Sequence, residues 1–193
     1  MISRRLFNTS LAAAPLAVSA CAAPALSLFT LAAPGAARQQ APLPGRPMVI
    51  EVARVSLPDE IDSEDMLLRA GATLIRSSTG RWASRLSLQV TDRITARLAE
   101  RRPDALVVNR AQAQSPSYRI VINIARLDVL SDGIGTLEAD WQIIPADAAI
   151  PAFRDRGRFS ARQEAFKADP LLVAAIGDLL DQLASAIKIT ALR

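Results

Sequence analysis

The feature that most constrains the fold is an alternation of apolar and polar residues from Tyr118 to Val129. Apolar side chains at every second position are typical of a β-strand with one buried face. Ser131-Asp132-Gly133 is a turn signal, and the alternation returns from Thr136 to Ile144. We therefore predict an antiparallel hairpin over these residues.

Two segments carry a helical period instead. Between about Ser84 and Pro103 apolar residues recur every four positions, and Pro103 ends the pattern. These residues are Leu86, Val90, Ile94 and Leu98. A second helix begins at Asp169, a suitable N-cap, with Pro170 at the first helical position. Its broad apolar face favours packing on a sheet, while Asp178, Asp181 and Gln182 are expected to point outward.

Further strands are predicted from shorter patterns. A β-branched run begins at Met48 and is stopped by Pro58. The other candidate strands are Met66–Leu68, Ala72–Arg76, Ala105–Asn109 and Arg156–Arg162. Ser77-Ser78-Thr79-Gly80 is interpreted as a turn. The order of strands, helix, strands and helix predicts an α+β fold, with a mainly antiparallel sheet covered on one face by two helices.

The N-terminus is typical of a bacterial lipoprotein signal. Arg4 and Arg5 precede an apolar stretch, and small residues lead to Cys21, the only cysteine in the chain. We expect cleavage after residue 20 and lipidation of Cys21. The Arg4-Arg5 pair fits either a twin-arginine export motif or an ordinary Sec leader. The expected organisation is therefore a signal peptide over 1–20, a lipidated tether over 21–47 and a folded domain over 48–193.

The tether is rich in proline and alanine, a composition that does not bury enough surface to fold alone. It is interrupted by the apolar patch from Leu26 to Leu31. Two interpretations stay open for this patch: a strand that docks on the domain, or additional hydrophobicity of the leader.

Composition excludes several kinds of chemistry. The chain has no histidine, so a Ser-His-Asp triad and a histidine-ligated zinc centre are excluded. The acidic residues between Asp59 and Asp65, and the pair Asp128 and Asp140, are the remaining material for a carboxylate-based site. We interpret the first group as a solvated turn and predict no catalytic residue, metal or cofactor. The net charge of +4 falls to +2 when Arg4 and Arg5 leave, and without a basic block no nucleic-acid binding is expected.

Candidate partner contacts lie on the first predicted helix. Arg85, Arg93 and Arg97 follow one side of it, continued by Arg101, and a basic stripe of this kind suits lipid phosphates or an acidic partner. A solvated helix face is the simpler interpretation. Trp82 is a further candidate contact, although core packing is favoured for it and for Trp141.

Three motifs together resemble the PqiC/YmbA type of ABC transport auxiliary lipoprotein. The first is Val49-Ile50-Glu51-Val52 leading to Leu57-Pro58 and Ile61-Asp62, and the second is Arg81-Trp82-Ala83. The third joins the strand from Tyr118 to Asp128 with Leu137-Glu138-Ala139-Asp140-Trp141. Ser63 stands where this family usually has arginine, and Ser84-Arg85 replaces its usual Glu-Pro.

The resemblance implies a non-enzymatic, lipid-anchored docking component of an MCE-type system that moves lipids between membranes. Its partners would be an MCE-domain protein and an ABC permease/ATPase complex. The module would sit at the outer membrane and face the periplasm, held by an acylated, palmitate-bearing Cys21. The resemblance also makes it a candidate homo-oligomer. Two alternatives stay open: an outer-membrane biogenesis factor that assists or plugs a β-barrel partner, and a carboxylate-based cell-wall hydrolase.

Overall fold

A computed structural model describes residues 25–31, 45, 47–162, 169–189 and 192. Eight strands and two helices are assigned within these residues. In chain order they are β1 (Ser27–Phe29), β2 (Met48–Val52), β3 (Asp65–Ala70), β4 (Thr73–Trp82), α1 (Leu86–Arg101), β5 (Ala105–Val108), β6 (Tyr118–Val129), β7 (Ile134–Pro145), β8 (Phe153–Arg162) and α2 (Asp169–Ala186).

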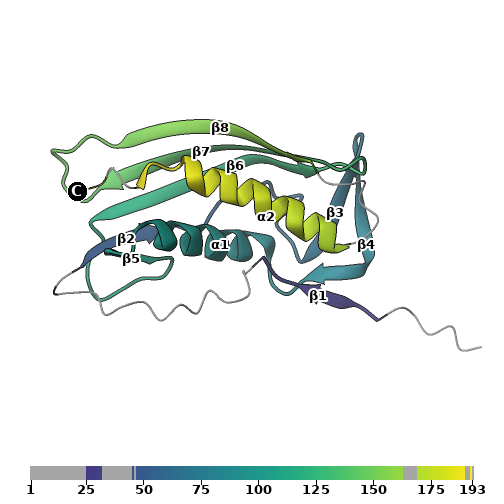
Figure 1. The fold of residues 1–193 in the computed structure, drawn as a ribbon, viewed down its shortest axis with the longest axis horizontal. Helices are drawn as coiled ribbons and strands as arrows, with labels where there is room; N and C mark the ends of the chain where they lie inside the picture. The colour runs from purple at the N-terminus through teal and green to yellow at the C-terminus, as the bar shows by residue number, and fades with distance from the viewer. Residues whose placement is uncertain (1–24, 32–44, 46, 163–168, 190–191, 193) are drawn as a thin grey trace, which may run out of the picture.

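The predicted hairpin is confirmed as the centre of a five-stranded sheet with the order β5-β2-β6-β7-β8. β6 and β7 pair antiparallel from Tyr118 opposite Pro145 to Val129 opposite Gly135, with one irregularity after Ile124. Gly133 has a φ of 92° in the turn between them, a conformation that favours glycine. The long curved strands of this sheet are seen in Figure 1.

A second sheet has the order β1-β4-β3. The two strands predicted at Met66–Leu68 and Ala72–Arg76 lie within β3 and β4, which pair antiparallel on either side of Gly71, whose φ is 60°. The turn predicted at residues 77–80 is wrong, because β4 continues through them to Trp82. The polar residues do make local bonds, with the Ser77 hydroxyl accepting from the Thr79 and Gly80 amides at 3.2 and 3.0 Å. Residues 77–79 lie at an irregularity of the β3–β4 pairing, between Arg76 opposite Leu67 and Arg81 opposite Asp65, and pairing with β1 begins at Gly80.

The α+β class is confirmed, and the topology is more mixed than the sequence indicated. β2 lies between β5 and β6 and is parallel to both, while β1 is parallel to β4. β2 also ends at Val52, before the predicted limit at Pro58. The following residues stay attached to β6, since the Ser56 amide donates to the Ile122 carbonyl at 3.1 Å.

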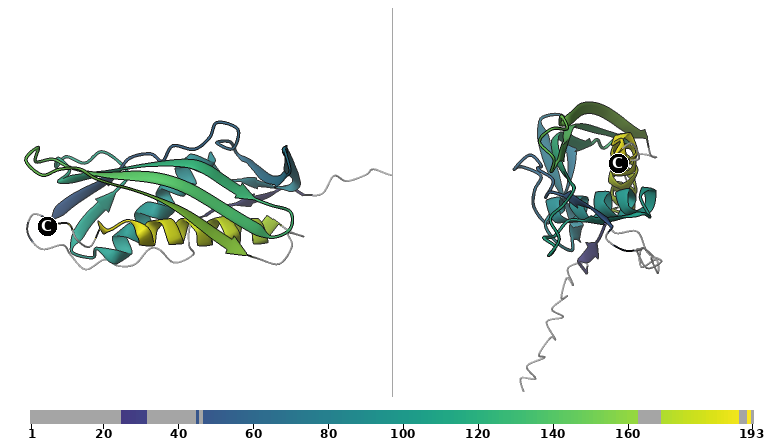
Figure 2. Two further views of the ribbon diagram at one scale, coloured as in Figure 1. Left: turned by 90° about the horizontal axis from the view of Figure 1, so that it is seen from above. Right: turned by 90° about the vertical axis from the view of Figure 1, so that its left-hand side faces the viewer.

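The two helices lie side by side on one face of the five-stranded sheet (Figure 1), and the end-on view in Figure 2 shows the sheet curving around them. Both predicted apolar stripes are buried between the helices and the sheet. Trp82 and Trp141 are each 2% exposed, so core packing is confirmed for both. No helix in the described part of the chain is long and apolar enough to span a membrane.

Candidate functional site

The apolar patch near the N-terminus is the docking strand, the first of its two interpretations. Ser27, Leu28 and Phe29 pair parallel with the last three residues of β4. The Phe29 carbonyl accepts a hydrogen bond from the Ala83 amide at 2.8 Å. Leu31 follows with only 1% of its surface exposed. The segment just downstream of Cys21 is thus part of the folded body.

Two side chains of α1 hold the main chain of Leu31. The Leu31 amide donates to Gln89 Oε1 at 2.8 Å, and Arg93 Nη1 donates to the Leu31 carbonyl at 2.7 Å. Gln89 is fixed in turn because its Nε2 donates to the Ser84 carbonyl at 3.0 Å. The amide and the carbonyl of Leu31 therefore both have hydrogen-bond partners, as buried main-chain groups require.

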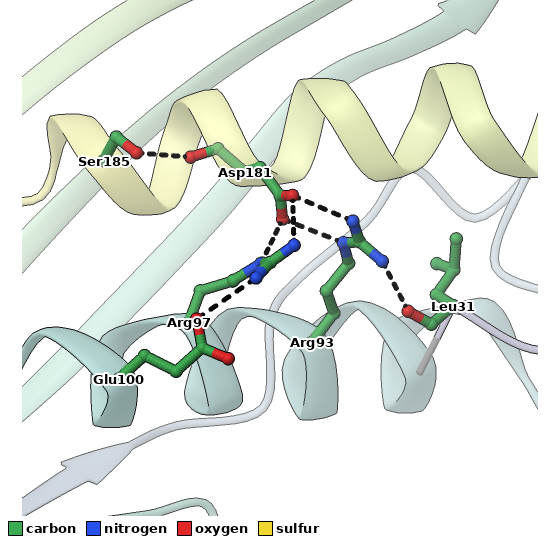
Figure 3. A network of polar contacts seen from close by, with 6 residues as sticks. All are labelled: Leu31, Arg93, Arg97, Glu100, Asp181 and Ser185. Carbon is green, nitrogen blue, oxygen red and sulfur yellow. Dashed lines mark hydrogen bonds and ion pairs between the residues drawn. The ribbon is translucent and has the colours of Figure 1, made fainter. Parts of the chain in front are cut away.

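Arg93 also joins α1 to α2 through Asp181 (Figure 3). Its Nε and Nη2 donate to the two carboxylate oxygens at 2.9 Å each. Arg97 approaches the same carboxylate with its own fork, at 2.9 and 2.7 Å, and also donates to Glu100 at 3.1 Å. We call Leu31, Gln89, Arg93, Arg97 and Asp181 the anchor clamp, since they tie the N-terminal strand to both helices.

The charges of the anchor clamp support one another. Burial alone would raise the pKa of Asp181, but the hydrogen bonds and charges of Arg97 and Arg93 outweigh it and hold that pKa below its usual value. The pKa of Arg97 is raised, chiefly by its hydrogen bonds to Asp181 and Glu100. Gly177 makes room for this contact, because a β-carbon there would lie 3.0 Å from Arg93 Nη2.

The interpretation of the arginine stripe as a solvated face is wrong for its C-terminal part. Arg93 is 14% exposed and Arg97 33% exposed at the side chain, and both face α2. Arg101 donates to the carbonyls of Ala184 and Ile187 near the end of α2. The expected outward direction of Asp181 is wrong for the same reason, since paired opposite charges bring the two helix faces together.

Trp82 and Arg85 are placed differently from the clamp. Trp82 ends β4 in the core, so its ring is not presented to a partner. Arg85 lies just before α1 with 57% of its side chain exposed, 3.5 Å from Asp62. Of the four candidate partner contacts, Arg85 is the one that lies openly at the surface.

Within the acidic segment from Asp59 to Asp65, Asp62 has a structural role. Asp62 Oδ1 accepts from the Ser87 amide at 3.0 Å and so caps the first turn of α1 from a distant loop. Burial acts to raise the pKa of Asp62, but the hydrogen bonds from Ser87 and Arg85 prevail and lower it. A carboxylate engaged in this way is poorly suited to act as a general acid.

The other acidic candidates also have partners. Asp128 is buried and paired with Arg69 and Arg126, and Asp140 accepts from Asn123 at 2.9 Å. Within the described residues, no group of three His, Cys, Asp or Glu side chains is placed to hold a metal ion. The predicted lipidation residue Cys21 and the predicted export residues Arg4 and Arg5 lie outside the described residues.

Sequence reasoning did not single out Gln89 or place Asp181 in a site. A signal for Gln89 exists, because it lies midway between Arg85 and Arg93 in the same four-residue spacing. A signal for Asp181 is its position beside Leu180 at the margin of the apolar stripe of α2, because residues at this margin contact a neighbouring helix.

The described geometry is that of a small α+β module whose N-terminal strand is built into its fold. The chain belongs to the family of ABC-type transport auxiliary lipoprotein components, whose family model matches residues 29–188. The match begins in the docking strand and ends just beyond α2. No curated protein matches the chain.

Solved structures share this fold at low sequence identity. A crystal structure of an uncharacterised protein is 16% identical, with a TM-score of 0.63 over 74% of this chain and 91% of that one. A Xanthomonas campestris protein assigned to DUF330 is 17% identical, with a TM-score of 0.58 over 83% and 89% of the two chains. At these identities the likeness concerns the fold.

Proposed function

We propose that the protein is a non-enzymatic docking component of an MCE-type ABC transporter that moves lipids between the inner and outer membranes. In this proposal Cys21 carries the lipid, Arg4 and Arg5 direct export, and the module sits on the periplasmic side of the outer membrane. Its partners are the MCE-domain protein and, through it, the permease/ATPase complex.

One observation carries the proposal: the family match covers the folded module and begins within the strand that follows the lipoprotein-type cysteine. The anchor clamp supports this role, because it ties the strand that follows Cys21 to both helices of the module. The partnered state of Asp62 and Asp128 supports a binding role over hydrolysis.

Affinity purification of the full-length protein from crosslinked cells tests the transporter assignment. We expect recovery of an MCE-domain protein together with a permease and an ATPase. Recovery of an outer-membrane β-barrel in their place would overturn the assignment in favour of barrel biogenesis. The mass of the detergent-solubilised protein in analytical ultracentrifugation tests whether it forms the homo-oligomer that the family resemblance implies.

A Cys21→Ser variant tests the anchor separately. We expect loss of labelling by a clickable palmitate analogue and release of the protein from the membrane fraction. A matched Ser27→Ala variant, changed in the docking strand but not at the cysteine, should keep both. Continued labelling of the Cys21→Ser variant would contradict lipidation at this residue.

A further inference from the structure

β8 is the last strand of the five-stranded sheet, and within the described residues no strand pairs with its outer edge (Figure 1). It is ten residues long and presents a row of main-chain N–H and C=O groups along this edge. Two of these groups already have partners: the Arg156 amide donates to Asp155 Oδ1 at 2.9 Å, and the Ser160 carbonyl accepts from Gln182 Nε2 at 3.0 Å. Such an edge accepts an extended peptide as an additional strand.

Four arginines lie on one face of this edge strand. Arg154, Arg156, Arg158 and Arg162 occupy even positions, which share one face of a strand and are spaced by about 7 Å per two residues. All four are exposed. Arg158 forms an ion pair with Glu138 at 2.8 Å. Arg154 and Arg162 stand opposite Gln142 and Ile134, which carry no charge.

The other face of β8 is apolar except for the exposed Asp155, and it begins at a cavity. Phe159 and Ala161 pack toward the core, and Phe153 heads the same face with 39% of its surface exposed. A cavity of about 400 Å³ lies here, lined by Phe153, Ile143 and the 46%-exposed Ile150. Lys188 Nζ lies 5.8 Å from the centroid of the Phe153 ring at this site.

We propose that the free edge of β8 binds an extended segment of a partner protein in which acidic and apolar residues alternate. Main-chain hydrogen bonds would hold the segment against β8. Its acidic side chains would lie beside Arg154, Arg156 and Arg162, and one of its apolar side chains would enter the cavity beside Phe153. Binding at this edge is independent of the transporter that the protein serves.

Charge favours this occupant over the chain itself. Residues 32–47 contain two arginines and no acidic residue, so they do not complement the arginine row. Pairing of β8 with β8 of a second copy would bring two arginine rows together, which is unfavourable. Charged edge strands also serve to prevent unwanted pairing, so the test must distinguish binding from simple protection.

The test uses the full-length protein in detergent and a fluorescent nine-residue peptide of alternating glutamate and valine. Binding is measured by fluorescence anisotropy. The same peptide with N-methyl groups on alternate amides keeps its charge but loses main-chain donors. A lysine–valine peptide reverses the charge, and a shuffled peptide keeps the composition without the alternation.

We expect saturable binding of the alternating acidic peptide and at least about tenfold weaker binding of the other three peptides. The double variant R154E/R162E, which places no new acid opposite an existing one, should also weaken binding at least about tenfold. The control variant R76E/R110E carries the same charge change at exposed arginines outside β8 and should bind normally, although it also replaces the exposed Arg76–Asp65 ion pair by two acids. Thermal melting of both variants verifies folding.

Absence of saturable binding would overturn the proposal. Equal binding of the N-methylated peptide would reduce the effect to charge attraction and overturn edge pairing. Equal loss in R154E/R162E and R76E/R110E would likewise reject β8 as the site. A dimer in analytical ultracentrifugation that is lost in R154E/R162E would assign the edge to a second copy.

Discussion

Arg93 of α1 and Asp181 of α2 form a two-pronged ion pair with both N–O distances at 2.9 Å, although 88 positions separate them in the chain. The same guanidinium donates its third contact to the main chain of Leu31. One arginine therefore connects the docking strand, the first helix and the second helix.

Replacing Asp181 with asparagine should destabilise the fold by about 2 kcal/mol, because two guanidinium groups lose a shared charged acceptor. The cost stays below that of a fully buried pair because Asp181 is 30% exposed. Urea denaturation measures the change. Asp59→Asn, at an exposed residue of the acidic turn, is the control and should be nearly neutral.

The lowered pKa of Asp181 predicts an acid-dependent loss of stability. Since the folded state binds this proton more weakly than the unfolded state, the contribution of Asp181 is complete above its ordinary pKa of about 3.9 and declines as the pH falls through the lower folded value. The stability difference between the wild type and Asp181→Asn should therefore shrink below about pH 4. An undiminished difference at low pH would contradict the ion pair.

Leu31→Ala should loosen the docking strand from the body. The residue is 1% exposed, and a truncation of this kind costs about 2–4 kcal/mol. Leu28, on the same segment, is 65% exposed, so Leu28→Ala is a matched control with little expected effect. Limited proteolysis should cut the N-terminal segment faster in Leu31→Ala alone. Equal cleavage in both variants would contradict a role of Leu31 in holding the docking strand on the body.

Gly80→Ala should destabilise the junction of β4 with α2. A β-carbon at residue 80 would lie 2.7 Å from Asp169 Cγ and 2.9 Å from Met66 Sδ, which is closer than packed atoms approach. It would also displace the hydrogen bond from the Thr79 hydroxyl to Asp169, which measures 2.8 Å. Overpacking of this kind costs about 1–3 kcal/mol. Thermal melting checks the loss, with the exposed Ser78→Ala as control.

The elements predictable from the sequence were those with a local period. Apolar residues repeat every two positions in the hairpin that begins at Tyr118 and about every four positions in both helices. The buried face of each element can therefore be recognised from residues close together in the sequence. The parallel pairing of β2 with both β5 and β6 has no such local signature, because nothing in a buried run states which strands will flank it.

The anchor clamp was less predictable for the same reason. A row of arginines on a helix looks alike whether it meets water or a carboxylate on a distant helix. Its role became visible once Asp181 and Gly177 were placed against Arg93. The turn expected at residues 77–80 failed differently, since these residues form an irregularity inside β4, which pairs with β3 both before and after them.

The parallel seat of β1 has a mechanical consequence. The chain enters β1 from the side of Cys21 and runs on to Leu31. Tension applied from the N-terminus along the strand therefore loads the main-chain hydrogen bonds of β1 together, in shear, instead of breaking them one by one. Leu31 and the Arg93 side chain lie beyond the C-terminal end of that strand and resist the remaining force. In a force-spectroscopy experiment with one handle at the N-terminus, β1 should therefore detach in a single event.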